Sequence, residues 1–310
     1  MKRPRIGITL GDPAGIGPEV VAKALARPSL VESAELRPIG APSVLAQWGL
    51  AGDLAIPTAD IDLALARPGQ VSAECGRAAL DAIRAGVALC LSGQLHALVT
   101  GPIHKRAAQL AGMQAPGHTE FIASLCGNPE VRMLLAGQRL RTIHVTTHLP
   151  LQDACRLATA GRIWRTIQLG HQALQSLGFE QPRIAVAGLN PHAGEEGLFG
   201  DEDRQQILPA VEQARRHGIQ ALGPLPPDTI FLRAWNGEFD LVVAMYHDQG
   251  HIPMKLLEFE QTVNITVGLP IVRTSVDHGT AFDIAGQNRA RAENMVSAIE
   301  MAIRLSRPRP

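Results

Sequence analysis

The chain has 310 residues, and its 29 Lys and Arg residues equal its 29 Asp and Glu residues, so its formal net charge is zero. A chain with no surplus of positive charge has no global field that would hold a polyanion, so we expect no nucleic-acid partner. Hydrophobic residues make up 45% of the chain and aromatic residues only 4%, which indicates a folded protein without an aromatic platform for bases.

The four cysteines are widely spaced and form no C-x-x-C pair; they are Cys75, Cys90, Cys126 and Cys155. We therefore expect reduced thiols rather than a disulfide framework. The first predicted strand, at residues 6–10, follows the N-terminus too closely for the apolar core of a signal peptide. No apolar run has the length of a membrane span, so the sequence predicts a cytoplasmic protein without a membrane partner.

Short runs rich in β-branched residues alternate with longer stretches rich in Ala and Leu. The short runs predict strands, in chain order, at residues 6–10, 97–100, 141–147, 183–187, 241–245 and 263–267. The longer stretches predict helices at residues 19–26, 76–91, 154–177, 201–217 and 293–306. This alternation is typical of largely parallel sheets with helices on both faces, so the sequence predicts an α/β fold.

Polar residues and glycines follow several of these strands directly. They occupy residues 100–102, 147–148, 190–194 and 246–250. Ligands of α/β folds bind at the carboxyl ends of the strands. Reactive side chains at several strand ends therefore predict an enzyme whose single site is assembled from distant segments.

Three of the 11 histidines, His148, His192 and His247, each come just after a predicted strand. Imidazole is a ligand for divalent metals such as zinc, and three protein ligands leave positions open for a substrate. A histidine in a loop also often serves only as a hydrogen-bonding group. From the residues alone, a metal site and three such loop histidines are equally supported.

Two further histidines have a spacing of four from members of this set. His144 precedes His148 on a predicted strand, where side chains four apart need not converge, so we assign His144 a structural role. His251 follows His247, but Gly250 is expected to break any helix between them. The remaining histidines on helical or surface stretches are expected to be bystanders: His96, His104, His171 and His217.

Several other polar residues are candidates for binding or proton transfer. The glycine-rich segment 11–19, with Pro18 at a predicted helix start, fits an anion-binding turn and a plain tight turn equally well. Asp228 and Asp248 are candidates for acid–base work or for orienting a ligand. Cationic and neutral donors suited to a phosphate or carboxylate are provided by Lys255, Arg273, Asn264, His118 and Thr119.

Segments 11–19, 116–121, 147–150, 189–195, 245–250 and 273–286 together resemble the PdxA family. Its best-known members are 4-hydroxythreonine-4-phosphate dehydrogenases of vitamin B6 (pyridoxine) synthesis. Segments 11–19 and 277–286 also resemble the isopropylmalate and isocitrate dehydrogenases, which implies their two-domain α/β fold. By this analogy residues 1–115 plus 268–310 form a first domain on the cofactor side. Residues 116–267 form a second domain with metal, substrate and dimer contacts.

The resemblance also implies a set of site residues. A divalent metal, which is Zn, Co, Mn, Mg or Ni, is expected on His148, His192 and His247. In the family the active site is shared across a homodimer, so His247 is expected to complete the site of the partner subunit. The expected substrate contacts are His118, Thr119, Lys255, Asn264 and Arg273. NAD or NADP is expected at Gly11, Asp12, Gly15, His278, Gly279, Thr280 and Asp283.

The implied activity is that of a metal-dependent oxidoreductase, which oxidises the C3 hydroxyl of a 4-phosphorylated hydroxy acid to a β-keto acid that decarboxylates. The general base is left open among Lys255, Asp248 and Asp228. His251 replaces a usual apolar residue of the vitamin B6 enzymes and, with segments 197–201 and 281–283, resembles the branch acting on 4-phospho-D-threonate and 4-phospho-D-erythronate. The alternative is 4-phosphohydroxy-L-threonine; remoter alternatives are a cis-dihydrodiol dehydrogenase and a phosphotransacetylase-like transferase.

Overall fold

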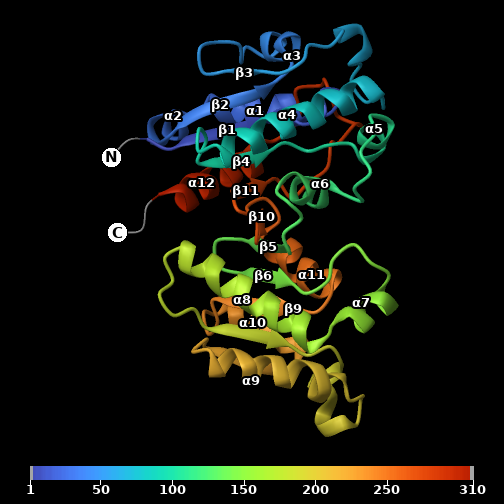
Figure 1. Cartoon of the computed structure of the whole chain (residues 1–310), viewed down its shortest axis with the longest axis vertical. Coiled ribbons are helices and arrows are strands. Elements are labelled where there is room, and N and C mark those ends of the chain that lie inside the picture. The colour runs from blue at the N-terminus through green and yellow to red at the C-terminus, as the bar shows by residue number, and fades with distance from the viewer. Residues whose placement is uncertain (1–2, 308–310) are drawn as a thin grey trace. The chain divides into compact units, whose positions relative to one another are not determined.

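The computed structural model describes residues 3–307. The chain divides into two compact units (Figure 1). The first contains residues 3–131 and 269–307, so the chain leaves it and returns, and the second is Arg132–Gly268. Each unit combines strands with helices packed against them, which confirms the predicted α/β class.

The first unit contains a parallel arrangement of strands in the order β3-β2-β1-β4-β11. The strands are β1 (Arg5–Thr9), β2 (Glu35–Gly40), β3 (Ile56–Pro57), β4 (Ala97–Thr100) and β11 (Val272–Ser275). The helices are α1 (Gly17–Leu25), α2 (Pro28–Ser33), α3 (Pro42–Gln47), α4 (Ala73–Leu91), α5 (Lys105–Leu110), α6 (His118–Leu125) and α12 (Glu293–Ser306), with a short 3₁₀ turn η1 (Leu63–Leu65).

The second unit has the strand order β10-β5-β6-β9-β7-β8, in which β5 is antiparallel to both neighbours and the remaining pairs are parallel. The strands are β5 (Arg132–Ala136), β6 (Arg141–His144), β7 (Ile184–Ala187), β8 (Ala221–Leu225), β9 (Leu241–Ala244) and β10 (Val263–Val267). The helices are α7 (Leu151–Leu157), α8 (Ala160–Ser176), η2 (Pro191–Gly197), η3 (Asp203–Ile207), α9 (Leu208–Arg216), α10 (Pro227–Trp235) and α11 (His247–Glu258).

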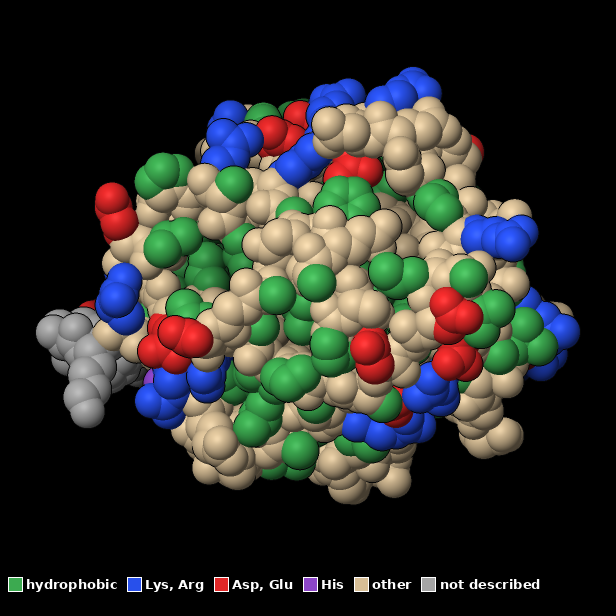
Figure 2. Space-filling view, turned by 90° about the horizontal axis from the view of Figure 1, so that it is seen from above, with side chains coloured by type: hydrophobic (Ala, Val, Ile, Leu, Met, Phe, Trp, Pro, Cys, Tyr) green, Lys and Arg blue, Asp and Glu red, His purple; other side chains and the backbone are tan. Residues whose placement is uncertain are grey.

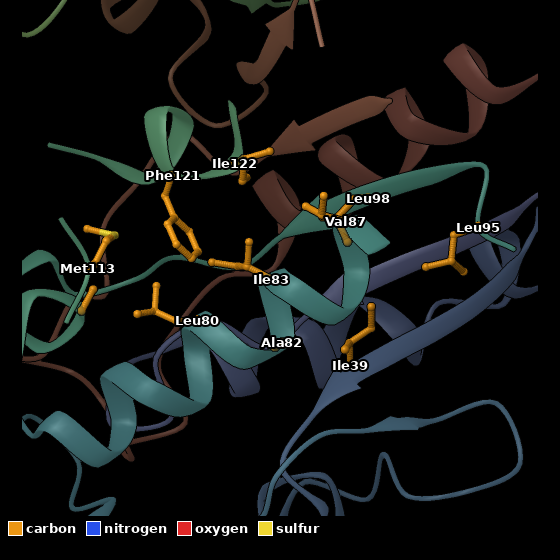
Figure 3. Close-up of a cluster of buried hydrophobic side chains, with 11 residues drawn as sticks. Ile39, Leu80, Ala82, Ile83, Val87, Leu95, Leu98, Met113, Phe121 and Ile122 are labelled. Carbon is orange, nitrogen blue, oxygen red and sulfur yellow. The ribbon is translucent and has the colours of Figure 1, made fainter. Parts of the chain in front are cut away.

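The core of the first unit explains why α6 belongs to it. Leu80 and Ile83 of α4 point toward Phe121 and Ile122 of α6, and all four side chains are buried (Figure 3). Full burial of one such side chain contributes about 1.5–3 kcal/mol, so this contact is favourable enough to fix the helix here. The division expected from the family analogy, at residue 116, differs from the observed one because this packing holds α6 in the first unit.

Two long predicted helices are interrupted. The predicted helix at 154–177 is two helices, because Ala158 leaves the helical conformation with a ψ of 56° between α7 and α8. The predicted helix at 201–217 starts with a π-helical turn, η3, before α9. The predicted strand at 141–147 ends at His144, although the next two backbone amides, of Val145 and Thr146, still donate to the carbonyl oxygens of Ala244 and Met245 at 2.8 and 3.2 Å.

The expectation that Gly250 breaks the helix between His247 and His251 is wrong. Helix α11 runs through Gly250 and also through Pro253. A Cβ at position 250 would lie 2.4 Å from Nε2 of His144, so only glycine allows this side chain against the helix. The tertiary contact outweighs the cost of glycine in a helix, which is about 1 kcal/mol.

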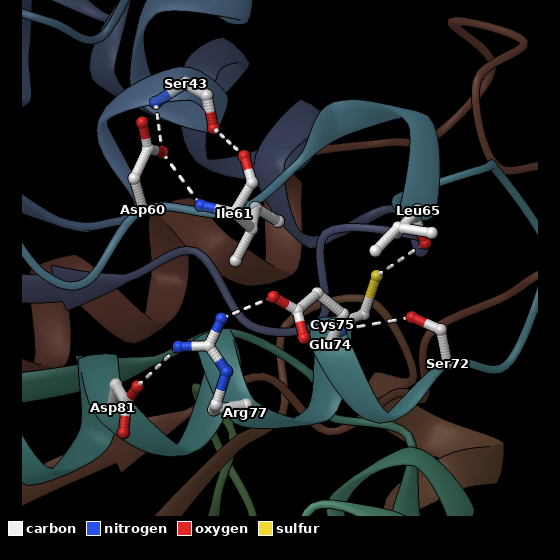
Figure 4. Close-up of polar contacts among 9 residues, drawn as sticks. All are labelled: Ser43, Asp60, Ile61, Leu65, Ser72, Glu74, Cys75, Arg77 and Asp81. Carbon is white, nitrogen blue, oxygen red and sulfur yellow. Dashed lines mark hydrogen bonds and ion pairs between the residues drawn. The ribbon is translucent and has the colours of Figure 1, made fainter.

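The segment between β3 and α4 is tied down by polar contacts (Figure 4). The carboxylate of Asp60 accepts hydrogen bonds from the backbone amides of Ser43 and Ile61 at 3.0 and 2.9 Å. Ser72 caps α4 by accepting from the amide of Cys75 at 3.1 Å. All four cysteines have free thiols.

The surface mixes the two signs of charge. On the face drawn in Figure 2, Lys and Arg side chains alternate with Asp and Glu side chains among hydrophobic ones, and neither sign gathers into one continuous patch. Within residues 3–307, none of the helices combines the length and the apolar character needed to cross a membrane.

Candidate functional site

His148 and His247 are brought together by neighbouring parallel strands of the second unit. His148 lies in the turn after β6, and His247 is the first residue of α11, which follows β9. Their ring centroids are 5.6 Å apart with the planes tilted by 44°. Both rings line an open cavity of about 380 Å³, together with Tyr246, Asp248 and Leu151.

The tautomer of His247 is fixed by its neighbour. Nδ1 of His247 lies 2.7 Å from Oδ1 of Asp248. A carboxylate accepts hydrogen bonds, so Nδ1 of the neutral ring carries the proton and Nε2 keeps its lone pair. This is the tautomer that binds a metal through Nε2, and a carboxylate on the other nitrogen is a common support of metal-binding histidines.

His192 lies elsewhere in the second unit, on the exposed segment η2. Its ring is near Phe199, with centroids 6.1 Å apart. Throughout residues 3–307, no group of three or more His, Cys, Asp or Glu side chains is placed to hold a metal. The structure therefore joins two of the three predicted ligands and leaves His192 outside that pair.

The segment that carries His192 has a strained backbone. His192, Ala193, Glu195 and Glu196 all have positive φ, between 40° and 57°. Non-glycine residues in this conformation cost about 1–2 kcal/mol each, so the surrounding contacts must hold it. The buried carboxylate of Asp203 accepts hydrogen bonds from the backbone amides that lead into the segment, those of residues 189 and 190, at 2.8 and 3.1 Å.

Two further imidazoles support the pair. The ring of His251 stacks on that of His247, with centroids 3.6 Å apart and planes 13° from parallel. Nδ1 of His251 lies 3.1 Å from Nε2 of His144 and 3.0 Å from the backbone oxygen of His247. Burial, followed by His251, lowers the pKa of His144 to about 3, so its ring is neutral. The sequence shows that His247 and His251 are four residues apart. Because Gly250 between them argued against a helix, the contact between the two rings was not predicted.

The first unit contains a buried cationic side chain. Arg273 of β11 is 2% exposed and donates from Nε and Nη2 to Oγ1 of Thr100, at 3.2 and 2.7 Å. Burial lowers its pKa to about 10, with an opposing effect from Glu120, so the guanidinium stays charged at neutral pH.

His118, at the start of α6, has a shielded Nε2 with no hydrogen-bond partner. Burial, and then the charge of Arg273, hold the pKa of His118 well below its usual value. A guanidinium and an unsatisfied neutral imidazole in the same unit are the donors that an anionic substrate group requires, and Thr119 follows directly in α6.

The remaining predicted residues are spread over the second unit. Lys255 is on α11, with Nζ 4.9 Å from the ring centroid of Phe259. Asn264 is on β10 and has a buried Oδ1 with no hydrogen-bond partner. Asp228 is exposed in the first turn of α10, which packs against η2.

The two predicted cofactor segments are packed together in the first unit. The backbone amide of Ile16 donates to the carbonyl oxygen of Thr280 at 3.0 Å. A Cβ on Gly15 would lie 2.9 Å from Thr280, and a Cβ on Gly11, whose φ is 75°, would lie 2.3 Å from the carbonyl oxygen of Pro102. Both glycines are therefore required by close backbone approach. His278, Gly279 and Asp283 belong to the same segment as Thr280.

Asp12, in the first of these segments, has a buried carboxyl group. It is 1% exposed, its Oδ1 accepts from the backbone amide of Ala14 at 2.9 Å, and its Oδ2 has no hydrogen-bond partner. Burial is the main cause that raises the pKa of Asp12 to about 6. His104, expected to be a bystander, opposes this shift and stacks on Phe282 with centroids 4.6 Å apart.

Residues 18–302 match the family model described as "Pyridoxal phosphate biosynthetic protein PdxA". The chain is 47% identical to the D-threonate 4-phosphate dehydrogenase of Cupriavidus necator, over 98% of this chain and 97% of that protein. It is 46% identical to the 4-hydroxythreonine-4-phosphate dehydrogenase of Beijerinckia indica, over 98% and 96%. A solved structure of 4-hydroxythreonine-4-phosphate dehydrogenase from Klebsiella pneumoniae matches with a TM-score of 0.86 and 42% identity, over 98% of this chain and all of that chain.

Proposed function

Since the chain belongs to the PdxA family of dehydrogenases, we propose that this oxidoreductase uses NAD or NADP and a divalent metal to oxidise the C3 hydroxyl of a 4-phosphorylated hydroxy acid. The β-keto acid product would then lose CO2. The observation that carries the proposal is the pair of imidazoles on neighbouring strand ends, with the lone pair of His247 Nε2 fixed by Asp248. The nicotinamide cofactor is assigned to the packed segments that contain Gly11–Gly15 and His278–Asp283.

The residues that the structure brings together supply part of a metal-binding site. His148 and His247 supply two imidazoles, and His192, on its strained segment, is the proposed third ligand, with one of the three supplied by the other subunit of a dimer. When bound, the metal supplies Lewis-acid stabilisation of the negative charge that develops on the substrate oxygen. Asp248 keeps the proton on Nδ1 of His247, so that Nε2 stays available.

The anionic end of the substrate is assigned to Arg273, His118 and Thr119. The buried guanidinium is charged at neutral pH, and its bonds to Thr100 hold it in one orientation. A fixed cation orients the reacting carbon relative to the other groups, which is one source of rate acceleration. Asn264, with its unsatisfied Oδ1, is assigned to a hydroxyl of the same substrate.

We assign the general base to Lys255 in preference to the two aspartates. The carboxylate of Asp248 is engaged by His247. Lys255 lies on the same face of α11 as His247 and His251, since the three residues are spaced by four. The observation that supports Asp228 as the general base is that its helix, α10, packs against η2, the segment that carries His192.

For the substrate we favour 4-phospho-D-threonate and 4-phospho-D-erythronate over 4-phosphohydroxy-L-threonine. Several of the most similar relatives are named D-threonate 4-phosphate dehydrogenase, at 42–47% identity. His251, which stacks on His247, is the residue in which the chain departs from the vitamin B6 enzymes. Relatives of both names match at similar identity, so an assay decides between them.

We propose a homodimer, supported by an apolar stripe on α11. Ile252 and Leu256 of α11 are spaced by four and share one face, and Phe259 directly follows the helix; the three side chains are 56%, 80% and 63% exposed. A cluster of large hydrophobic side chains left in water is typical of an interaction surface.

The test is the formation of reduced nicotinamide, followed by absorbance, with purified protein, a divalent metal and each phosphorylated substrate in turn. Turnover of the threonate or erythronate alone supports our assignment, whereas turnover of the amino acid alone would move the enzyme to vitamin B6 synthesis. Turnover of only a cis-dihydrodiol, or acyl-phosphate chemistry without nicotinamide, would replace the proposal by one of the remoter alternatives. His192→Ala should abolish turnover without unfolding the protein.

A further inference from the structure

The hydrogen-bond partners of His144 and His251 indicate which nitrogen of each ring carries a proton. Nδ1 of His144 faces the backbone oxygen of Met133 at 3.3 Å, and an oxygen of this kind only accepts. The neutral His144 ring therefore carries its proton on Nδ1 and accepts at Nε2. Nδ1 of His251 faces two acceptors, this Nε2 and the backbone oxygen of His247, so it carries a proton and donates.

This arrangement gives His251 a fixed ring. Its Nδ1 is tied to β6 through His144 and to the first turn of its own helix through the His247 carbonyl. The residue is 8% exposed, so little room is left for another rotamer. Its flat face lies against the imidazole of His247, nearly parallel to it.

Gly250 leaves room for the contact between His144 and His251. Helix α11 has glycine at position 250, where a Cβ would meet Nε2 of His144 at 2.4 Å and its Cδ2 at 3.0 Å. A glycine costs helix stability, and here it allows the close approach of His144 to His251.

We propose that His251 is a positioning residue that holds the His247 imidazole in one orientation, and that His144 anchors it. Asp248 holds one edge of the His247 ring and His251 covers its face, so the ring is restrained in two directions. The proposal rests on the proposed function only where it takes His247 as a metal ligand. Supports behind a metal-binding histidine typically change metal affinity by about 10–100-fold.

The test compares His251→Phe and His144→Phe with the double variant in the full-length protein. Each keeps a flat ring and removes one end of the same hydrogen bond. We expect each to weaken Zn²⁺ binding by roughly tenfold or more, measured by competition with a chromogenic chelator, and the double variant to be no worse than the single ones. His251→Asn, whose amide nitrogen replaces the Nδ1 donor, should recover part of the loss.

A second readout is independent of metal and of turnover. In wild-type protein, the ¹⁵N-detected ring signals of His247 should be sharp, because the ring has one orientation, whereas in His251→Phe they should broaden, because the ring samples several orientations while Asp248 still sets its tautomer. His217→Phe is the matched control, because His217 is an exposed ring in the same unit, beside Trp164. Circular dichroism and thermal unfolding show whether each variant is folded.

The outcomes separate this proposal from the proposed function. Wild-type Zn²⁺ affinity and an unchanged His247 spectrum in His251→Phe would overturn the positioning role. If the wild-type protein binds neither Zn²⁺ nor Co²⁺, the metal assignment fails, and the ring spectra alone then decide whether His251 holds His247. If His251→Phe does not fold, His251→Asn and His144→Phe carry the same test.

Discussion

At the scale of single residues, Asp12 shows how burial sets the charge state of a candidate cofactor residue. Its pKa is raised to about 6, so the folded protein holds this proton more tightly than the unfolded chain, whose value is near 3.8. The stability from this group is therefore fully present below pH 3.8 and is lost as pH rises through about 6. At neutral pH, Asp12 is ionised at a cost to the fold.

Asp12→Asn should remove this cost, because asparagine is uncharged and its Oδ1 still accepts from Ala14. We expect the variant to be more stable at pH 7–8 by roughly 1–3 kcal/mol, since one pKa unit corresponds to about 1.4 kcal/mol. The measurement is the free energy of unfolding in denaturant at a series of pH values without cofactor. Asp60→Asn is the control, because hydrogen bonds from Ser43 and from Ile61 lower the pKa of Asp60 and its contribution is lost as pH falls. Parallel profiles for wild type and Asp12→Asn would contradict the argument.

Arg273 is a buried cation whose hydrogen bonds to Thr100 hold it in one orientation. Arg273→Lys keeps the charge but loses the two donors that contact Thr100. We expect kcat/KM to fall by about 10–100-fold, mainly through KM, because a charged hydrogen bond contributes about 1.5–3 kcal/mol. Steady-state kinetics at saturating cofactor and metal measure it, and an unchanged KM for the phosphorylated substrate would remove Arg273 from the anion site.

At the scale of elements, α11 is the helix on which the site depends, and it is fixed at two places. Gly250 lets it approach His144 of β6. At its last residue, the buried carboxylate of Glu258 accepts from the backbone amides of Gln138, Arg139 and Leu140 in the β5–β6 turn, at 2.6, 3.0 and 3.0 Å. These contacts set the direction in which His247, His251 and Lys255 are presented.

Glu258→Gln should loosen the far end of α11. The neutral amide has one accepting oxygen where the carboxylate has two, so at least one turn amide loses its partner and the charge-assisted character is lost. We expect a loss of about 2–3 kcal/mol in the free energy of unfolding. Glu212→Gln, at an exposed position of α9, is the control and should change stability by less than about 0.5 kcal/mol. Equal stabilities for the two variants would mean that the turn does not depend on the carboxylate.

These elements also show how far sequence reasoning reaches. The strands at 97–100 and 263–267 and the helix at 293–306 were predicted with the bounds the structure has, because their local patterns and tertiary contacts agree. Helix α11 was missed, because Gly250 and Pro253 oppose a helix locally and only the packing of His144 explains the glycine. The strand-end position of His148 and His247 was visible in the pattern, whereas the support from His251 required the fold.

At the scale of the whole molecule, we propose one explanation for the exposed apolar side chains of α11 and for the incomplete ligand set of the proposed metal site. Within residues 3–307 of one chain, His148 and His247 lie together, but no group of three or more His, Cys, Asp or Glu side chains is placed to hold a metal. The same helix that carries His247 exposes Ile252 and Leu256, and the exposed Phe259 directly follows it. If a second copy covers this stripe, it also brings its own residues to the helix that carries His247, the proposed metal ligand.

Leu256→Glu should therefore separate the subunits and weaken the metal site together. The side chain is 80% exposed, so a glutamate costs a single chain little, whereas at a covered interface it buries a charge without a partner. We expect a shift from dimer to monomer in sedimentation, with a loss of Zn²⁺ affinity over the same range of protein concentration. Leu110→Glu, at an exposed leucine of α5 in the first unit, should leave both unchanged. A monomeric Leu256→Glu variant that binds Zn²⁺ as tightly as the wild type would show that one chain completes the site, and the segment that carries His192 would then have to move toward His148 and His247.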